Sequence, residues 1–554
     1  MSLKKDIKKY TPRKEQQDAL DFVAKNIHDQ KFILMDLPVG VGKSYLGLMI
    51  ADWYEKNIDS KAKFDILTGN KLLQDQYVSE FESINDLKGK DNYQCQQYSC
   101  SCAKGKEFNR LNKTSCDYCP WDDAKNSYLG GQISLTNFFL YVLYVLYVPD
   151  LLRSRGARVL IVDEAHLFDE VFSSFISVKI TENQIKRLKF RNEWDILKQL
   201  KTINDIESYI KFLRYLVKEI GTAISDIENE IGGNLKTMNL NQLKRVNKIS
   251  KATDKKSSEM KLMDIAVELQ QLLSKIDIFL KEYTNDPGNW VIESEWNDKT
   301  KTKEHSLEPI WANGYLDKYV WSHYDKVILM SGTILNKDLF CFLNGLDPSQ
   351  TAYHSIPSPF AVTNRPIYYM PIGKMTFKTK EDTFKNYVPY IKKIMSKYDS
   401  VKGIIHTHNF ELSNWIKETI DNERFIFHDS SNKDEMLRKH MESEGGTVIV
   451  SPSVSTGVSF DGEKSRFQII SKIPYPSLAS NKNKTRLKVK PDYYEWKTVG
   501  DIIQMYGRSV RNEFDFADTI IIDGCFSDVM RNSSYLMPTW FTDAIKKIEI
   551  KKTA

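Results

Sequence analysis

A glycine-containing loop between two apolar runs near the N-terminus places the strongest limit on how this chain can fold. The run KFILM, which ends at Met35, is typical of a buried strand, and DLPVGVGKSYLGLMIA leads from it through a tight loop into a helix. Units in which a strand, a loop and a helix follow one another pack as helices on a parallel sheet. The sequence therefore predicts an α/β fold.

The same loop has the chemistry of a phosphate site. Its backbone N–H groups and the start of its helix can point at phosphate oxygens, while Lys43 can reach the β and γ phosphates and the Ser44 hydroxyl can hold Mg²⁺. Leu37 stands where the first glycine of this pattern is usual, but Gly40 and Gly42 are present. We therefore expect these two glycines, Lys43 and Ser44 to bind ATP with magnesium.

A second motif adds carboxylates to this site. In RVLIVDEAHLFDE the apolar residues 159–162 predict another buried strand, which ends in Asp163 and Glu164 and is followed by His166. At the carboxyl edge of a parallel sheet, Asp163 can hold Mg²⁺ through water and Glu164 can orient the attacking water. We expect Asp163 and His166 to contribute to the ATP site as well.

Positive charge for the transferred phosphate is available near the C-terminus. The segment VGDIIQMYGRSVRNEFDFADTIIID contains Gln504, Arg508 and Arg511 on a predicted helix, followed by a strand. Residues three apart can project from one helical face, so both arginines can reach one ligand. An arginine on the γ-phosphate accelerates hydrolysis by roughly 10³ to 10⁵.

Five of the seven cysteines lie in one stretch, NYQCQQYSCSCAKGKEFNRLNKTSCDYCPW, from Asn92 to Trp121. Tetrahedral zinc and a four-iron cluster each need four thiolates, so one thiol is surplus. From spacing alone zinc and iron–sulfur both remain open, with zinc slightly ahead. The cysteines of the stretch are Cys95, Cys100, Cys102, Cys116 and Cys119.

Bulk composition describes an ordinary globular protein of several domains. The 554 residues are 41% hydrophobic and 27% charged, and the formal net charge of +6 is compatible with nucleic acid without indicating it. The longest apolar run, residues 138–148, is too short for a bilayer and predicts a buried strand or helix. We expect a cytoplasmic protein, in a bacterial cell or a phage-infected host, in which clustered cysteines bind metal rather than form disulfides.

The ordered motifs resemble those of the superfamily 2 helicases, specifically the iron–sulfur helicases typified by XPD and DinG. They run from YTPRKEQQDAL through DLPVGVGKS, VDEAH, VILMSGTIL and TVIVSPSVSTGVSFDG to QMYGRSVR, and cover nearly the whole chain. XPD-like members also place a proline just before the phosphate loop, as Pro38 does here. The resemblance implies two RecA-like P-loop motor domains, the first interrupted by an iron–sulfur insertion and a helical Arch insertion.

The resemblance also assigns residues. It places Arg13 and Gln16 in the adenine-reading motif, residues 331–333 in the motif that couples hydrolysis to strand movement, and Gly457 in motif V. Motif V itself departs from the family, because Thr456 and Ser459 replace two carboxylates and leave Asp461 as the nearest one.

Two further segments are placed by the resemblance or by charge. KGIIHTHNFEL resembles the first strand of the second motor domain, with His406 and Thr407 at its end near the DNA. The predicted loop PYPSLASNKNKTRLKVK carries basic residues at alternate positions, which suit a solvated surface and a phosphate contact equally. They are Lys482, Lys484, Arg486, Lys488 and Lys490.

The place of the cysteine stretch among the family's motifs changes which metal is expected. XPD-like helicases carry a 4Fe-4S domain between the first motor motifs and VDEAH, and GKDNYQC and CPW resemble the flanks of its first and last ligands. The resemblance therefore puts iron–sulfur ahead of zinc. Its ligands would be Cys95, Cys102, Cys116 and Cys119, with Cys100 as the alternate for Cys102.

The domains expected from these motifs follow the chain in six pieces. Motor domain 1 comprises 1–90, 121–170 and 311–337, the iron–sulfur insertion 91–120, the helical Arch-like insertion 171–310, and motor domain 2 residues 338–554.

The expected function is that of an ATP-dependent DNA helicase. We expect movement on single-stranded DNA, 5′ to 3′ by resemblance, with unwinding of forked DNA by a monomer and no membrane partner. The alternative is a DNA-stimulated ATPase that remodels or displaces nucleoprotein without separating strands, since the same motor residues would serve it.

Overall fold

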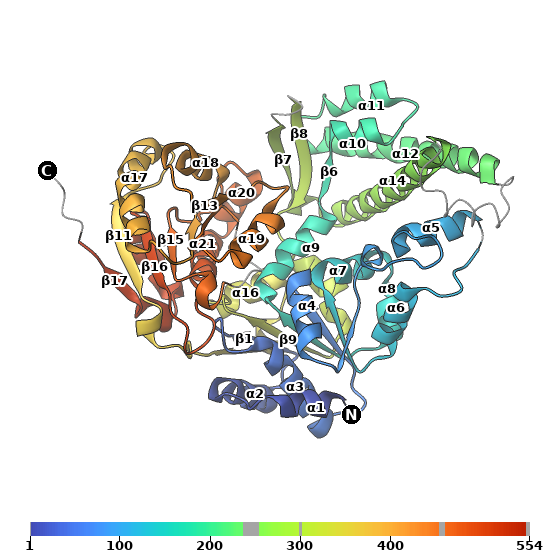
Figure 1. Cartoon of the computed structure of the whole chain (residues 1–554). Coiled ribbons are helices and arrows are strands. Elements are labelled where there is room, and N and C mark those ends of the chain that lie inside the picture. The colour runs from blue at the N-terminus through green and yellow to red at the C-terminus, as the bar shows by residue number, and fades with distance from the viewer. Residues whose placement is uncertain (1, 113, 236–253, 298–301, 454–459, 550–554) are drawn as a thin grey trace.

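Two parallel seven-stranded sheets organise the chain in the computed structural model, which describes residues 2–112, 114–235, 254–297, 302–453 and 460–549. Figure 1 shows one sheet in each half of the molecule, with helices packed around both. This arrangement confirms the predicted α/β fold with two RecA-like domains.

The first sheet has the order β10-β1-β9-β5-β2-β4-β3. Its strands are Thr351–Ser355, Phe32–Asp36, Lys326–Ser331, Val159–Asp163, Phe64–Thr68, Ile133–Asn137 and Ile84–Asp86. Because β9 lies between β1 and β5, the phosphate loop, the SGT motif and the DEAH motif follow three adjacent strands at one edge of the sheet.

Helices cover both faces of this sheet, and alternate residues of β1 serve the two faces. Leu34 packs in one hydrophobic core and Ile33 in the other, as expected for a strand whose side chains alternate. The helices are α1 (Ser2–Lys9), α2 (Lys14–Asn26), α3 (Lys43–Asn57), α4 (Lys71–Glu80), α7 (Phe138–Tyr147), α8 (Pro149–Arg155), α9 (Phe168–Ile176), α15 (Asn313–Tyr319) and α16 (Lys337–Asn344).

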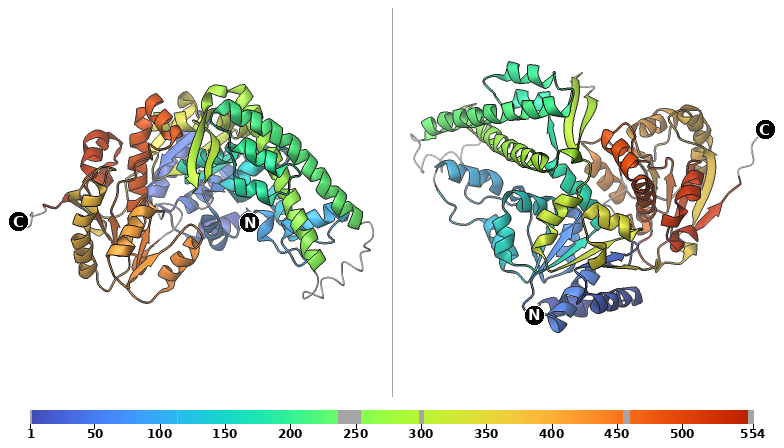
Figure 2. Two further views of the ribbon diagram at one scale, coloured as in Figure 1. Left: turned by 90° about the horizontal axis from the view of Figure 1, so that it is seen from above. Right: turned by 180° about the vertical axis from the view of Figure 1, so that it is seen from behind.

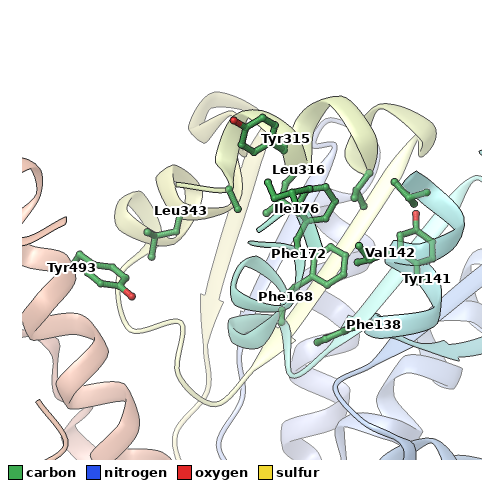
Figure 3. Close-up of a cluster of buried hydrophobic side chains, with 14 of the residues drawn as sticks. Phe138, Tyr141, Val142, Phe168, Phe172, Ile176, Tyr315, Leu316, Leu343 and Tyr493 are labelled. Atoms are coloured by element: carbon green, nitrogen blue, oxygen red, sulfur yellow. The ribbon is translucent and has the colours of Figure 1, made fainter. Parts of the chain in front are cut away.

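The apolar run at residues 138–148 forms helix α7 and packs in the larger core. Figure 3 shows Tyr141 and Val142 of α7 close to Phe172 of α9, with Leu316 of α15 beside them. This helix has the buried position predicted from its sequence. None of the helices in the described ranges has the length and apolar character needed to cross a bilayer.

The second sheet has the order β13-β14-β12-β15-β16-β11-β17. Its strands are Phe425–Phe427, Val448–Ser451, Gly403–His406, Phe467–Ile470, Asp518–Asp523, Ile367–Gly373 and Ile545–Lys547. Its helices are α17 (Lys380–Lys397), α18 (Phe410–Thr419), α19 (Lys433–Glu442), α20 (Asn481–Val489), α21 (Pro491–Tyr506), α22 (Phe526–Ser533) and α23 (Thr539–Thr542).

The boundary predicted between the motor domains, at 337/338, is too early. Strand β10 pairs with β1 in the first sheet, so motor domain 1 continues to Ser355 and the link to β11 spans residues 356–366. This boundary could not be predicted from the local pattern, because β10 follows a helix and a turn in the usual way for either domain.

The segment between β3 and β4 holds the clustered cysteines and two helices, α5 (Cys102–Asn112) and α6 (Pro120–Gly130). It forms a small hydrophobic cluster of its own around Leu87, Trp121 and Tyr128.

The second insertion is helical only in part. Helices α10 (Glu182–Arg187), α11 (Glu193–Leu200), α12 (Ile206–Leu235) and α14 (Asp254–Asn285) are joined by an antiparallel sheet of β6 (Val178–Ile180), β8 (Thr302–Pro309) and β7 (Trp290–Asn297). Figure 2 shows the long helices α12 and α14 projecting from this sheet. The prediction missed the sheet because β7 and β8 are rich in polar residues, β6 has only three residues, and the helical periodicity of the rest of the insertion is strong.

Candidate active site

A cavity of about 780 Å³ lies between the two motor domains and is lined from both sides. Its walls include every described residue that the sequence predicted for ATP binding or catalysis. These are Arg13, Gln16, Gly40, Gly42, Lys43, Ser44, Asp163, Glu164, His166, Gln504, Arg508 and Arg511. Gly457, with Thr456 and Ser459 of motif V, lies outside the described residues.

The phosphate loop is held in the conformation that its glycines allow. Gly40 and Gly42 have φ angles of 90° and 81°, in the region that favours glycine, and α3 begins at Lys43. Arg13 donates from Nη1 to the Gly40 carbonyl at 2.7 Å, and Gln16 donates from Nε2 to the Gly42 carbonyl at 3.2 Å. The predicted adenine-reading residues therefore also brace the loop.

The pKa values of the two carboxylates of the DEAH motif are shifted in opposite directions. Burial raises the pKa of Asp163 to about 6, although Lys43 opposes the shift. Burial also opposes ionisation of Glu164, but the charges of Lys43 and the two arginines outweigh it and hold its pKa well below the usual range. Lys43 Nζ is 3.7 Å from Glu164 Oε1, and Oε2 accepts no hydrogen bond from the described part of the chain. Glu164 is thus an ionised group with an oxygen available to a water molecule.

Tyr77 of α4 is a site residue that the sequence analysis missed. Its side chain is fully buried, its hydroxyl donates to Asp163 Oδ2 at 3.0 Å, and the Ser44 side chain hydrogen-bonds to the same hydroxyl. Burial raises the pKa of Tyr77 well above its ordinary value, so it remains a donor. One phenol therefore joins both predicted magnesium ligands. A tyrosine in KLLQDQY has nothing in its local pattern to distinguish it from a core residue.

A hydrogen-bonded path crosses from the DEAH motif to the second motor domain. His166 Nδ1 lies 2.8 Å from Ser331 Oγ, which is 3.3 Å from Thr333 Oγ1. Gln504 donates to Thr333 Oγ1 at 3.1 Å and accepts from Arg508 Nη2 at 2.8 Å. Because burial lowers the pKa of His166 to about 4, the imidazole is neutral at the start of this path.

The two arginines follow helix α21 rather than lie on it, which corrects the prediction. The helix ends at Tyr506, and Gly507 begins the turn that carries Arg508 and Arg511. Burial lowers the pKa of both, and Arg511 Nε has no hydrogen-bond partner among the described residues. Asp461 lines the same cavity and favours the charged form of Arg511. A buried guanidinium with an unused donor suits an anionic ligand.

The segment with His406 and Thr407, predicted to be the first strand of the second motor domain, has a different place in the sheet. Strand β11 precedes β12, so the segment with His406 and Thr407 is not the first strand, and both side chains are buried. Burial lowers the pKa of His406 to about 4, and its Nε2 lies 3.2 Å from Gln468. His408, two residues later, lines a second cavity instead.

The basic run at 482–490 is a helix, α20, rather than a loop. Arg486 is 2% exposed and packs on the rings of Trp311 and Tyr493, while Lys482 Nζ is 3.6 Å from Glu308 of β8. These two basic side chains therefore join protein segments rather than present a free phosphate-binding row.

The cysteine thiols converge in the segment between β3 and β4. Cys95 makes side-chain hydrogen bonds with Cys100 and Cys116, and Cys102 does so with Cys119. All seven cysteines of the chain are free thiols, and burial raises the pKa of Cys100 to about 11. Within the described residues, no group of three or more His, Cys, Asp or Glu is arranged around a point that could hold a metal ion.

The second insertion touches both the cysteine segment and motor domain 2. Lys104 of α5 lies 3.3 Å from Asp264 of α14. Glu293 of β7 caps the start of α20, because its carboxylate accepts from the backbone N–H groups of Asn481 and Lys482 at 2.9 and 2.6 Å and from Ser480 Oγ at 2.7 Å. The insertion thus bridges two parts of the molecule that are distant in sequence.

A second cavity, of about 640 Å³, lies where this insertion meets motor domain 2. Lys179, Lys275 and His408 line it together with Tyr475 and several serines. Amines, hydroxyls and an aromatic ring are groups that contact a nucleic acid strand without reading its sequence.

Two family models match the chain. One described as helicase C-terminal domain matches residues 397–544, and one described as type III restriction enzyme, res subunit, matches residues 9–190.

Curated relatives and solved structures agree with these matches. A protein named probable ATP-dependent helicase from Methanocaldococcus jannaschii is 22% identical and aligns over 92% of each chain. The ATP-dependent DNA helicase CHL1 of Vanderwaltozyma polyspora is 21% identical over 75% of this chain and that of Saccharomyces cerevisiae 22% over 70%, but the chain spans only 57% and 52% of those proteins. A solved XPD helicase and Xpd4 of S. tokodaii share the fold with TM-scores of 0.61 and 0.57 at 14% and 13% identity, each over 97% of this chain and all of the other.

Proposed function

Because this chain belongs to the superfamily 2 helicases of the XPD type, we propose that it couples ATP hydrolysis to movement along single-stranded DNA and to separation of duplex DNA. One observation carries the proposal. Lys43 and Glu164 of one motor domain and Arg508 and Arg511 of the other line a single cavity. A site divided between two domains can change its affinity for nucleotide only by moving them.

The chain's own residues supply each part of the hydrolysis. The phosphate loop and Lys43 bind the triphosphate, and Ser44 and Asp163 are the ligands for magnesium, which neutralises phosphate charge when bound. Glu164 Oε2, which accepts no hydrogen bond within the described residues and lies 3.5 Å from His166 Nδ1, orients the attacking water. Arg508 and Arg511 stabilise the charge that develops on the γ-phosphate.

Hydrolysis reaches the rest of the molecule through the path between His166 and Gln504. Its first three members lie at the phosphate-facing end of the first sheet, and Gln504 lies on the helix that precedes the arginines. Release of the γ-phosphate removes the charge that holds the arginines in the cleft, so the domains separate. The next ATP closes them again.

The DNA strand is proposed to pass along the cavity between the second insertion and motor domain 2. Lys275 contributes an amine there, whereas Lys179 is paired with Glu295 and Glu304. Tyr475 supplies a ring for stacking, worth about 1 to 3 kcal/mol per base. Such contacts are indifferent to sequence, as a translocating motor requires. The proposed direction, 5′ to 3′, rests on the family resemblance.

An iron–sulfur cluster is proposed for the cysteine segment. The donor set fits in its chemistry, because five thiols converge in a segment with a hydrophobic cluster of its own. A cluster also tolerates a wider spacing than a single ion, since each of its irons takes its own thiolate. The proposed ligands are Cys95, Cys102, Cys116 and Cys119, because the residues around them resemble the flanks of the family's ligands, and Cys100 is the alternate for Cys102. When bound, the cluster would fix this segment beside α14.

Two measurements on one anaerobic preparation test these proposals. DNA-stimulated ATP hydrolysis is expected for the wild type and is abolished in Lys43→Ala, whereas hydrolysis that is indifferent to DNA would contradict the motor. Iron and acid-labile sulfide are expected at four of each per chain for a 4Fe-4S cluster. Zinc without iron would contradict the cluster while leaving the motor proposal intact.

A further inference from the structure

The segment that links the two motor domains packs directly against the phosphate loop. It spans residues 356–366, between the end of β10 and the start of β11, and its Phe360 is only 5% exposed. We propose that Phe360 is a positioning residue. It holds residues 507–511, the arginine-bearing turn, in place against the phosphate loop. This inference rests on the proposed ATP hydrolysis between the domains.

The ring of Phe360 occupies the space that a side chain at Gly40 would need. A Cβ built on Gly40 would lie 2.1 Å from Phe360 Cζ and 2.4 Å from Cε2, and 3.1 Å from the Arg511 carbonyl oxygen. Atoms that are not bonded cannot approach so closely, so glycine is required here for contact as well as for its φ of 90°. The linker ring and the arginine-bearing turn therefore meet at the same phosphate-loop residue.

The other neighbours of the ring belong to the arginine-bearing turn. Phe360, Val510 and Ala517 form a small cluster of buried hydrophobic side chains, and Val510 immediately precedes Arg511. A second close approach lies beside it, where a Cβ on Gly507 would be 2.8 Å from Val39 Cγ2. Only about 30 Å³ of free volume remains between these groups, which is room for about one water molecule. Because the packing is this tight, a shift of the ring must shift the turn.

The linker itself is fixed to motor domain 2. Arg365, which is 4% exposed, donates from Nε to the Phe360 carbonyl at 3.0 Å. Its Nη1 donates to the Tyr506 hydroxyl at 2.9 Å and to the Trp540 carbonyl at 2.7 Å. Tyr506 is the last residue of α21, so Phe360 and the arginines are attached to one rigid support. In the closed cleft the Phe360 ring contacts Gly40. This contact fixes how far the two arginines extend toward the γ-phosphate.

The test is the steady-state kinetics of Phe360→Ala, with Phe377→Ala as the matched control, since Phe377 is 89% exposed. We expect kcat for DNA-stimulated ATP hydrolysis to fall about tenfold or more, because arginine alignment contributes roughly 10³ to 10⁵ to the rate. Affinity for a fluorescent ATP analogue should stay within about threefold, since the phosphate loop still binds the ground state. Phe360→Leu keeps most of the buried volume and should recover most of kcat. If the alanine variant does not fold, the kcat of the leucine variant is compared with that of the wild type instead.

A double variant distinguishes alignment from general loss of structure. If the ring acts through the arginines, Phe360→Ala should cost little further kcat in an Arg511→Ala background. Equal losses in both backgrounds, an unchanged kcat in the single variant, or a loss of nucleotide affinity as large as the loss of kcat would overturn the inference. A wild type whose hydrolysis ignores DNA would instead contradict the proposed function.

Discussion

Replacing Tyr77 by phenylalanine removes one oxygen atom from the magnesium site and leaves its packing in place. The hydroxyl donates to Asp163 Oδ2 at 3.0 Å and hydrogen-bonds with Ser44, and it is fully buried, so water cannot replace it. Tyr77→Phe therefore tests whether this phenol holds the two predicted magnesium ligands in their working state.

The magnitude follows from the charge of the acceptor. A hydrogen bond to a charged group is worth about 1.5 to 3 kcal/mol, and one pKa unit corresponds to about 1.4 kcal/mol. Burial raises the pKa of Asp163 to about 6, and the Tyr77 hydrogen bond lowers it, so loss of the bond should raise it by a further one to two units. Asp163 binds magnesium only when ionised, that is, above its pKa. The acidic loss of activity should therefore begin at higher pH in the variant.

The assay is ATP hydrolysis as a function of pH and Mg²⁺ concentration, with Mg²⁺-dependent binding of a fluorescent ATP analogue alongside. We expect the acidic midpoint of Tyr77→Phe to rise by about one unit and its Mg²⁺ requirement near pH 6.5 to increase several-fold, while the two proteins converge by about pH 8.5. Tyr54→Phe, another buried tyrosine of the same domain, should match the wild type. Superimposed profiles, or a midpoint shifted to lower pH, would show that the Tyr77 hydroxyl does not favour the ionised form of Asp163.

Three further substitutions have outcomes that the contacts predict. Glu164→Gln should retain ATP binding but lower kcat at least a hundredfold, measured by hydrolysis and analogue binding, because it removes the carboxylate proposed to orient water. Glu293→Ala should lower the free energy of unfolding by about 1 to 2 kcal/mol in a denaturant titration, because three donors at the start of α20 lose their acceptor, and Glu293→Gln should lose less. Cys102→Ser should lose bound iron while Cys100→Ser retains it, and the reverse result would exchange their roles.

The parts of the fold that could be predicted are those in which an apolar run is followed directly by a functional motif. Buried parallel strands are continuous apolar runs, so 159–162 was identified as a strand from its sequence, and the motifs after such strands meet at one edge of the sheet. That rule alone brought Lys43, Asp163 and Glu164 together.

The predictions fail where contacts between distant segments determine where a helix ends or what a side chain does. Arg508 and Arg511 have helical spacing, but Gly507 ends the helix and the turn is instead held by Val39 and Phe360 of other segments. Tyr77 and Phe360 look like core residues in sequence because their roles come from neighbours 86 and 320 positions away, at Asp163 and Gly40. The sheet in the second insertion was missed because β6 pairs with β8 across the long helices and the β7–β8 hairpin is rich in polar residues.

Strand displacement measures whether the divided cleft drives movement on DNA. Forked duplexes with a 5′ or a 3′ single-stranded tail, and a 5′-tailed duplex carrying a bound protein, should be assayed with the wild type and Lys43→Ala. We expect ATP-dependent strand separation from the 5′ tail by the wild type and none by Lys43→Ala. Removal of the bound protein without strand separation on either tail would contradict the helicase proposal and favour the nucleoprotein-remodelling alternative.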